Sequence, residues 1–143
     1  MNSSYSQYFK YCEVKPEFKK EFISLWSGWL GKDNLHKLDE VTEKEWARFN
    51  TLIRLIAESY RVELLDCESE TISNVTDIES TLSTYEESKE KDSSGFSNYI
   101  LPELECVLSE DWDFTYILWH KKNGAIKALI PLIEKVGLKH FHD

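Results

Sequence analysis

Residues 114–119, with the sequence FTYILW, restrict the fold of this chain more than any other segment. In an extended strand alternate side chains point to opposite faces, so Phe114, Tyr116 and Leu118 lie on one side and the other three on the opposite side. Both sides are then largely apolar. Such a strand has to be covered on both faces, which favours a central position in a sheet with further layers above and below it.

A second apolar run, residues 104–108, precedes this strand and is separated from it by Ser109-Glu110-Asp111-Trp112-Asp113. Two runs of this kind about five residues apart predict a β-hairpin. The tip of that hairpin would carry Asp111, Trp112 and Asp113.

Two helices are predicted from end signals in the sequence together with the spacing of their apolar residues. Thr42 and Glu45 have the spacing of a capping box, and apolar residues recur behind them at helical intervals up to residue 60. Residues 126–136 have the same periodicity and are followed by Gly137, a residue typical of helix C-termini. Pro131 would either kink this second helix or begin a new one.

Four further segments complete the predicted order of elements. Residues 5–14 predict an edge strand, 16–31 a helix, and 75–85 a thin amphipathic helix. Residues 61–67 could extend the preceding helix or form a short strand, and we favour the strand. Together these elements predict a single α+β domain over residues 1–143, with helices packed on a small, mostly antiparallel sheet.

Composition is that of a globular protein, with 41% hydrophobic and 30% charged residues in a chain of 143. Three cysteines, Cys12, Cys67 and Cys106, lie far apart and form no CxxC pair. We therefore expect buried thiols, and neither a disulfide framework nor a cysteine zinc site. No apolar run is long enough to span a bilayer, and residues 1–14 lack the apolar stretch of a signal peptide. We expect a cytoplasmic protein that does not bind membranes.

Motifs of well-marked enzyme classes are missing from the sequence: it has no GxxxxGK[ST], GxGxxG, HExxH or GxSxG pattern and no EF-hand loop. With five glycines in all, a backbone cradle for phosphate is not expected. We therefore expect a protein without a cofactor and favour a binding protein over an enzyme, although enzymatic activity stays open.

Histidines offer one candidate metal site. His140 and His142 would share a face of an extended tail and could bind a transition metal, but no third ligand can be assigned, so no metal site is expected. His36 and His120 each lack an identifiable catalytic partner in the sequence. We assign both of them structural or solvent-facing roles.

Charge is distributed very unevenly along the chain. The net charge is −9, yet residues 39–113 carry 20 acids against six Lys and Arg, a net of −14. Residues 1–38 and 114–143 are each net basic. A negative field of this size repels phosphate backbones and attracts basic surfaces. We therefore expect a basic protein partner and no nucleic acid.

Seven residues are the predicted partner-binding site. The tip residues Asp111, Trp112 and Asp113 would supply an aromatic anchor and two carboxylates, unless the tip is an ordinary turn with its tryptophan folded back onto the core. The central acidic stretch adds four carboxylates, which otherwise serve only solubility: Glu68, Glu70, Asp77 and Glu79.

The function predicted from these features is non-enzymatic binding of a basic protein through an acidic surface. In size and acidity the chain is similar to small bacterial immunity and inhibitor proteins, although no motif carries that likeness. The alternative is a small-molecule-binding domain or minor enzyme with a pocket lined by Trp26, Trp29 and Trp46. A third arrangement that the sequence allows is a homodimer joined through its aromatic first strand; the oligomeric state is otherwise open.

Overall fold

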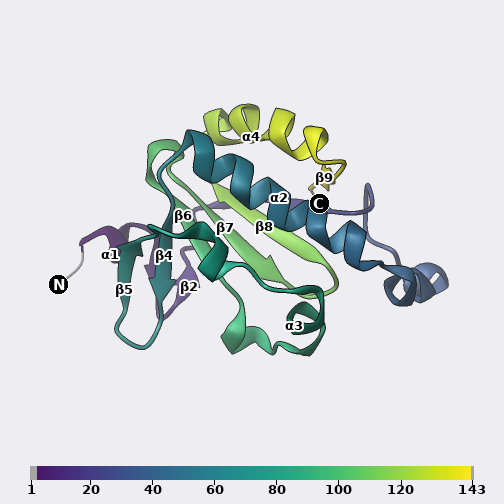
Figure 1. The fold of residues 1–143 in the computed structure, drawn as a ribbon. Coiled ribbons are helices and arrows are strands. Elements are labelled where there is room, and N and C mark those ends of the chain that lie inside the picture. The colour runs from purple at the N-terminus through teal and green to yellow at the C-terminus, as the bar shows by residue number, and fades with distance from the viewer. Residues whose placement is uncertain (1–2, 143) are drawn as a thin grey trace.

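The computed structural model describes residues 3–142, and an antiparallel sheet of seven strands forms its centre (Figure 1). This confirms the α+β class and the packing of helices on an antiparallel sheet. In spatial order the strands are β5 (Thr71–Asn74), β4 (Glu63–Asp66), β6 (Asn98–Leu101), β7 (Cys106–Asp111), β8 (Thr115–His120), β3 (Lys19–Ser24) and β9 (Lys139–Phe141).

Two long helices, α2 (Glu43–Ser59) and α4 (Asn123–Lys135), cover one face of this sheet (Figure 1). Their apolar sides form the larger core, in which Phe49 and Leu129 are fully buried. The capping box that was predicted at Thr42 is present, because its hydroxyl accepts from the Glu45 N–H and the Glu45 carboxylate accepts from the Thr42 N–H. Both predicted helices are therefore confirmed.

A smaller apolar cluster lies on the opposite face of the sheet. Here α1 (Ser3–Tyr8) and the two short strands β1 (Phe9–Lys10) and β2 (Glu13–Val14) pack over β5, β6 and β7. The edge strand predicted for residues 5–14 is therefore mostly wrong, since a short helix precedes the strands and these pair only with each other. The sheet is covered on both sides, as the pattern of β8 predicted.

The helix predicted for residues 16–31 is wrong. Residues 19–24 form β3, which pairs with β8 on one side and β9 on the other. Phe22 and Ile23 are both buried, on opposite faces of the sheet, which a strand allows and a one-sided helix does not. A loop then leads to a 3-10 helix, η1 (Lys32–Glu40).

The helix predicted for residues 75–85 is also wrong. In its place are a short 3-10 turn, η2 (Ile78–Thr81), and a helix that begins later, α3 (Tyr85–Glu90). Thr84 caps α3 with a second capping box, closed by Glu87. The remaining short turns are η3 (Ser93–Gly95) and η4 (Pro102–Leu104), and the strand favoured for residues 61–67 is confirmed as β4.

The register of β3, β7 and β8 defines two ends of the sheet. At one end Asp111 lies opposite Thr115, which lies opposite Ser24, and we call this the tip end. At the other, Cys106 lies opposite His120, which lies opposite Lys19, and we call this the His120 end.

Two further expectations concern burial and membranes. Of the three cysteines, Cys106 is buried, Cys12 is partly buried and Cys67 is exposed, so the expectation of buried thiols holds for one of them. Among residues 3–142, no helix combines the length and the apolarity that crossing a bilayer requires.

Candidate functional site

The tip of the β7–β8 hairpin is the candidate site. The predicted hairpin is confirmed, with a loop of three residues, Trp112, Asp113 and Phe114. Asp113 and Phe114 both have left-handed backbones, with φ of 59° and 54°. Successive residues with left-handed backbones suit the twist of a tight hairpin. In this loop the Phe114 side chain packs on the protein, whereas the Trp112 side chain is largely exposed.

Phe114 fixes the loop to the body of the protein. Its ring contacts Trp46 of α2, with centroids 6.0 Å apart, and Tyr85 of α3, with centroids 6.4 Å apart. Trp46 is itself buried and donates from Nε1 to the Ser83 carbonyl oxygen at 3.0 Å. The loop is thus anchored on one side by packed aromatic rings.

Trp112, by contrast, is 54% exposed. Its ring contacts Phe96 edge to face, with centroids 4.9 Å apart, and it does not fold back onto the core. A large exposed ring beside an aromatic neighbour has the chemistry of residues that anchor protein contacts.

Two small grooves border Trp112. One, of about 200 Å³, lies between the tip and the segment of residues 25–40, which contains η1 and is called the loop before α2 below. It is lined chiefly by Trp26, Trp29, Leu30, Leu35, Leu38 and Trp112. The other, of about 220 Å³, lies between the tip and α3, and is lined by residues that include Leu38, Asp39, Trp46, Lys89, Phe96 and Trp112. Trp112 and Leu38 border both, so together they form the ridge that separates the two grooves.

Carboxylates surround this ridge. Asp111 and Asp113 border both grooves, and Asp39 borders the second. Burial raises the pKa of the half-buried Asp111 carboxyl, while the N–H of Trp112 and the charge of Lys20 act in the opposite direction. Lys89 is the one lysine lining either groove, and it already contacts Glu86 at 3.4 Å. The tip is therefore locally acidic.

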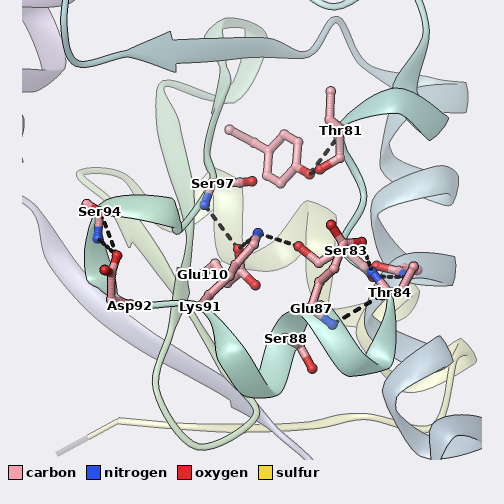
Figure 2. A network of polar contacts seen from close by, with 12 residues as sticks. Thr81, Ser83, Thr84, Glu87, Ser88, Lys91, Asp92, Ser94, Ser97 and Glu110 are labelled. Atoms are coloured by element: carbon pink, nitrogen blue, oxygen red, sulfur yellow. Dashed lines mark hydrogen bonds and ion pairs between the residues drawn. The ribbon is translucent and has the colours of Figure 1, made fainter.

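A buried ion pair positions the segment that carries Phe96. Lys91 follows α3, and its Nζ donates to Glu110 Oε1 of β7 at 2.9 Å and to the Ser83 hydroxyl (Figure 2). The same Glu110 oxygen accepts from the backbone N–H of Ser97 at 3.1 Å. The Glu110 side chain is only 3% exposed, so the pair is largely shielded from water. It ties the segment after α3 to the base of the tip.

The structure places two more of the predicted acids at the same end. β4 and β7 both run toward the tip end, with β6 between them, so the β4–β5 turn with Glu68 and Glu70 lies at the same end of the sheet but apart from the hairpin (Figure 1). It lies beside the β1–β2 turn, where the Cys12 thiol contacts the Cys67 carbonyl oxygen at 3.4 Å. The Glu68 and Glu70 side chains are both exposed. Of the seven predicted residues, the structure therefore brings Asp111, Trp112 and Asp113 together at the tip, whereas Glu68 and Glu70 share only its end of the sheet.

Asp77 and Glu79 lie elsewhere, at η2 beside the C-terminal half of α2. Glu79 receives two hydrogen bonds from the Arg54 guanidinium, at 2.7 and 2.8 Å, which hold the pKa of its carboxyl below the usual range. Its charge is therefore compensated within the protein. The structure does not bring this pair into the site.

The histidines predicted to share a face do so. His140 Nδ1 lies 2.6 Å from one carboxylate oxygen of Glu21, and His142 Nδ1 lies 3.0 Å from the other. Within residues 3–142, no three His, Cys, Asp or Glu side chains are grouped so that they could hold a metal ion. His36 is exposed in η1, and His120 is buried at the opposite end of the sheet.

Sequence reasoning missed the residues that the loop before α2 contributes. Leu30 lies in the segment that was predicted to be helical, and Leu35 and Leu38 follow it, so nothing linked them to the hairpin tip. Gly28 and Gly31, which interrupt the apolar run, were the available signal for a loop.

Comparison with known proteins adds no assignment to this site, since no protein-family model, curated protein or solved structure matches the chain.

Proposed function

We propose that this protein is a non-enzymatic binding protein that engages a basic protein partner through the hairpin tip. The observation that carries the proposal is the position of Trp112, an exposed ring between two grooves whose borders carry carboxylates. Tryptophan at the centre of a contact and acids around it are suited to receive arginine or lysine side chains. An immunity or inhibitor protein that covers the basic cleft of a nuclease would have this chemistry.

The size of the grooves supports a protein partner over a metabolite. Pockets for small molecules usually measure about 300–1,000 Å³. Each groove here has little more than 200 Å³, which suits one inserted side chain. Two such grooves on either side of one ring could receive two side chains of a single basic segment.

The alternative function, a tryptophan-lined pocket for a small molecule, rests on the first groove. Trp26, Trp29 and Trp112 all border it, whereas the predicted third member, Trp46, lies in the second groove. A metabolite that occupied the first groove would change tryptophan fluorescence at low concentration and independently of salt. A basic partner would bind more weakly as salt is added, because mobile ions screen charges beyond about 10 Å at 0.1 M.

The test uses random-sequence 12-residue peptides of net charge +5, 0 and −5, with binding measured by calorimetry at 20 and 300 mM salt. The basic set should bind at low salt, with an affinity that falls at least ten-fold at high salt. The double variant Asp111→Asn/Asp113→Asn should lose most of this binding. Its matched control, Asp77→Asn/Glu134→Gln, removes the same charge from exposed positions away from the tip and should retain it.

The proposal fails if peptides of all three charges bind alike, or if the two double variants weaken binding equally. The first result would indicate adhesion without charge recognition. The second would indicate attraction to net charge, with no defined site.

A further inference from the structure

A pocket beside α4 lies at the His120 end of the sheet. The proposed function does not use this pocket. It has a volume of about 590 Å³ and lies between β3, β8 and the first turn of α4, with His142 at its rim. That volume is within the usual range for small-molecule sites, unlike that of either tip groove.

One ring nitrogen of a buried histidine at this pocket lacks a hydrogen-bond partner. His120 is 6% exposed, borders the pocket, and its Nδ1 atom has no partner in the described part of the chain. Buried polar atoms are nearly always paired, so an unpaired one needs an explanation. A ligand that accepts or donates a hydrogen bond at this atom would supply the missing partner.

The N-terminus of α4 opens beside the same pocket. Its N-cap residue, Lys122, makes no capping hydrogen bond, and the first turn contains no acid. Uncapped N–H groups at a helix start, together with the positive end of the helix dipole, favour an anion. Asn123 borders the pocket directly and can donate from its side-chain amide.

A lysine on β3 adds to this preference. Lys19 borders the pocket and forms no ion pair among residues 3–142, whereas Lys20, which also borders the pocket, has its ammonium 4.9 Å from the centre of the Trp119 ring. Glu21 is the opposing group, but both oxygens of its carboxylate already lie at hydrogen-bonding distance from His140 and His142. The absence of a three-ligand cluster in the described residues argues against a cation at this position.

We infer that this pocket binds a small organic molecule through a phosphate group. Donors come from three elements: Lys19 on β3, His120 on β8 and the open first turn of α4. That arrangement suits an oxyanion with three terminal oxygens better than a planar carboxylate. The pocket exceeds what a bare phosphate ion fills, and the apolar side chains of Phe22 and Ile126 border the remaining space.

The experiment titrates ¹⁵N-labelled protein with phenyl phosphate, inorganic phosphate and benzoate while backbone amide shifts are recorded. Phenyl phosphate should move the amides of Lys19, His120, Asn123 and Gly124 at millimolar concentration or below. Inorganic phosphate should move the same amides at higher concentration, because it lacks the organic body. Benzoate should bind more weakly than phenyl phosphate; equal or tighter binding would assign the site to carboxylates and overturn the phosphate assignment.

Two lysine variants make the test specific. Lys19→Met should weaken phenyl phosphate binding about ten-fold, and it should fold normally because Lys19 is exposed. Lys139→Met removes the same charge at an exposed position opposite Ser24, at the other end of β3, and should change the affinity less than two-fold. His120→Phe, checked for folding by its amide spectrum, should also weaken binding.

Absence of shifts at 20 mM phenyl phosphate would overturn the inference, as would equal weakening by the two lysine variants. The inference does not depend on the proposed function, since the two sites lie at opposite ends of the sheet. Failure here would leave the peptide experiment unaffected.

Discussion

At the tip end of the sheet, aspartates flank an exposed tryptophan between two small grooves, whereas at the His120 end lysines and a buried imidazole border a larger pocket. The same strands, β3, β7 and β8, form both ends. The difference therefore lies in the residues at the strand ends and in the connections that cover them. One end is suited to protruding cationic side chains and the other to an anionic group that enters the protein.

Helix starts show the same contrast. α2 begins near the tip end and is closed by Thr42 and Glu45, so its first N–H groups are already partly satisfied. α4 begins at the His120 end without a side-chain cap. An anion would therefore gain backbone hydrogen bonds at α4 that it could not gain at α2.

The largest expected effect comes from the ion pair that supports the tip. Lys91→Met leaves the buried Glu110 carboxylate without its cation, and should lower the free energy of unfolding by about 3 kcal/mol. Urea denaturation followed by circular dichroism measures this. Lys89→Met breaks an exposed pair with Glu86 and should cost less than about 1 kcal/mol. Similar losses for the two variants would show that the Lys91 pair does not hold the tip end in place.

The second prediction separates binding from stability at the tip. Trp112→Ala should weaken binding of the basic peptides by about 2 kcal/mol, or roughly 30-fold, because a central tryptophan dominates such contacts. Its free energy of unfolding should change by less than about 1 kcal/mol, since the ring is mostly exposed.

Tyr11→Ala is the matched control for this variant. Tyr11 is 82% exposed and lies between β1 and β2, which pack on the face opposite α2 and α4. Its loss should leave peptide affinity unchanged. Equal weakening by the two variants would mean that any exposed ring serves, and that the tip has no special role.

The third prediction uses the two helix starts. Thr42→Ala removes a cap and should destabilise the protein by about 1 kcal/mol, whereas Lys122→Ser supplies one and should stabilise it by about 0.5–1 kcal/mol. The added cap should also weaken phenyl phosphate binding, because it occupies N–H groups that the anion would use. Thermal unfolding and calorimetry measure the two effects. An unchanged affinity in Lys122→Ser would remove the helix start from the anion site.

The fourth prediction concerns pH at the His120 end. Burial lowers the pKa of His120, with the Lys122 backbone and Glu21 acting in the opposite direction. Below pH 6.5 the unfolded chain therefore takes up a proton before the folded protein does, so stability falls as pH decreases through this range. The slope from this one group is at most about 1.4 kcal/mol per pH unit.

Comparison with His120→Phe isolates this contribution. Urea denaturation at pH 7.5 and 5.5 should show a steeper loss for the parent protein than for the variant. Parallel losses would show that the imidazole is not held neutral by burial.

Much of the local structure could be predicted from the sequence, because some signals depend only on neighbouring residues. The capping box at Thr42 and the glycine at position 137, where φ is 84°, fix helix ends without reference to the rest of the chain. The β7–β8 hairpin is likewise a contact between neighbours in sequence, and of its predicted tip residues Trp112 and Asp113 lie in the loop, with Asp111 at the end of β7.

Residues 19–24 show why the rest could not be predicted. Their apolar side chains also fit a helical repeat, and only pairing with β8 and β9, about 95 and 120 residues later, makes them a strand. The same limit applies to the candidate site. Glu68 and Trp112 project from the same end because β6 lies between β4 and β7, an order that no local pattern specifies.

The most direct test of this account is to map where a basic ligand binds. An arginine- and lysine-rich 12-residue peptide is titrated into ¹⁵N-labelled protein at low salt, and the tryptophan indole and backbone amide signals are followed. We expect shifts at the Trp112 indole, at residues 111–114 and in the loop before α2, with the signals of Lys19 and His120 unmoved. Shifts centred on the His120 end, or spread evenly over every acidic residue, would contradict it.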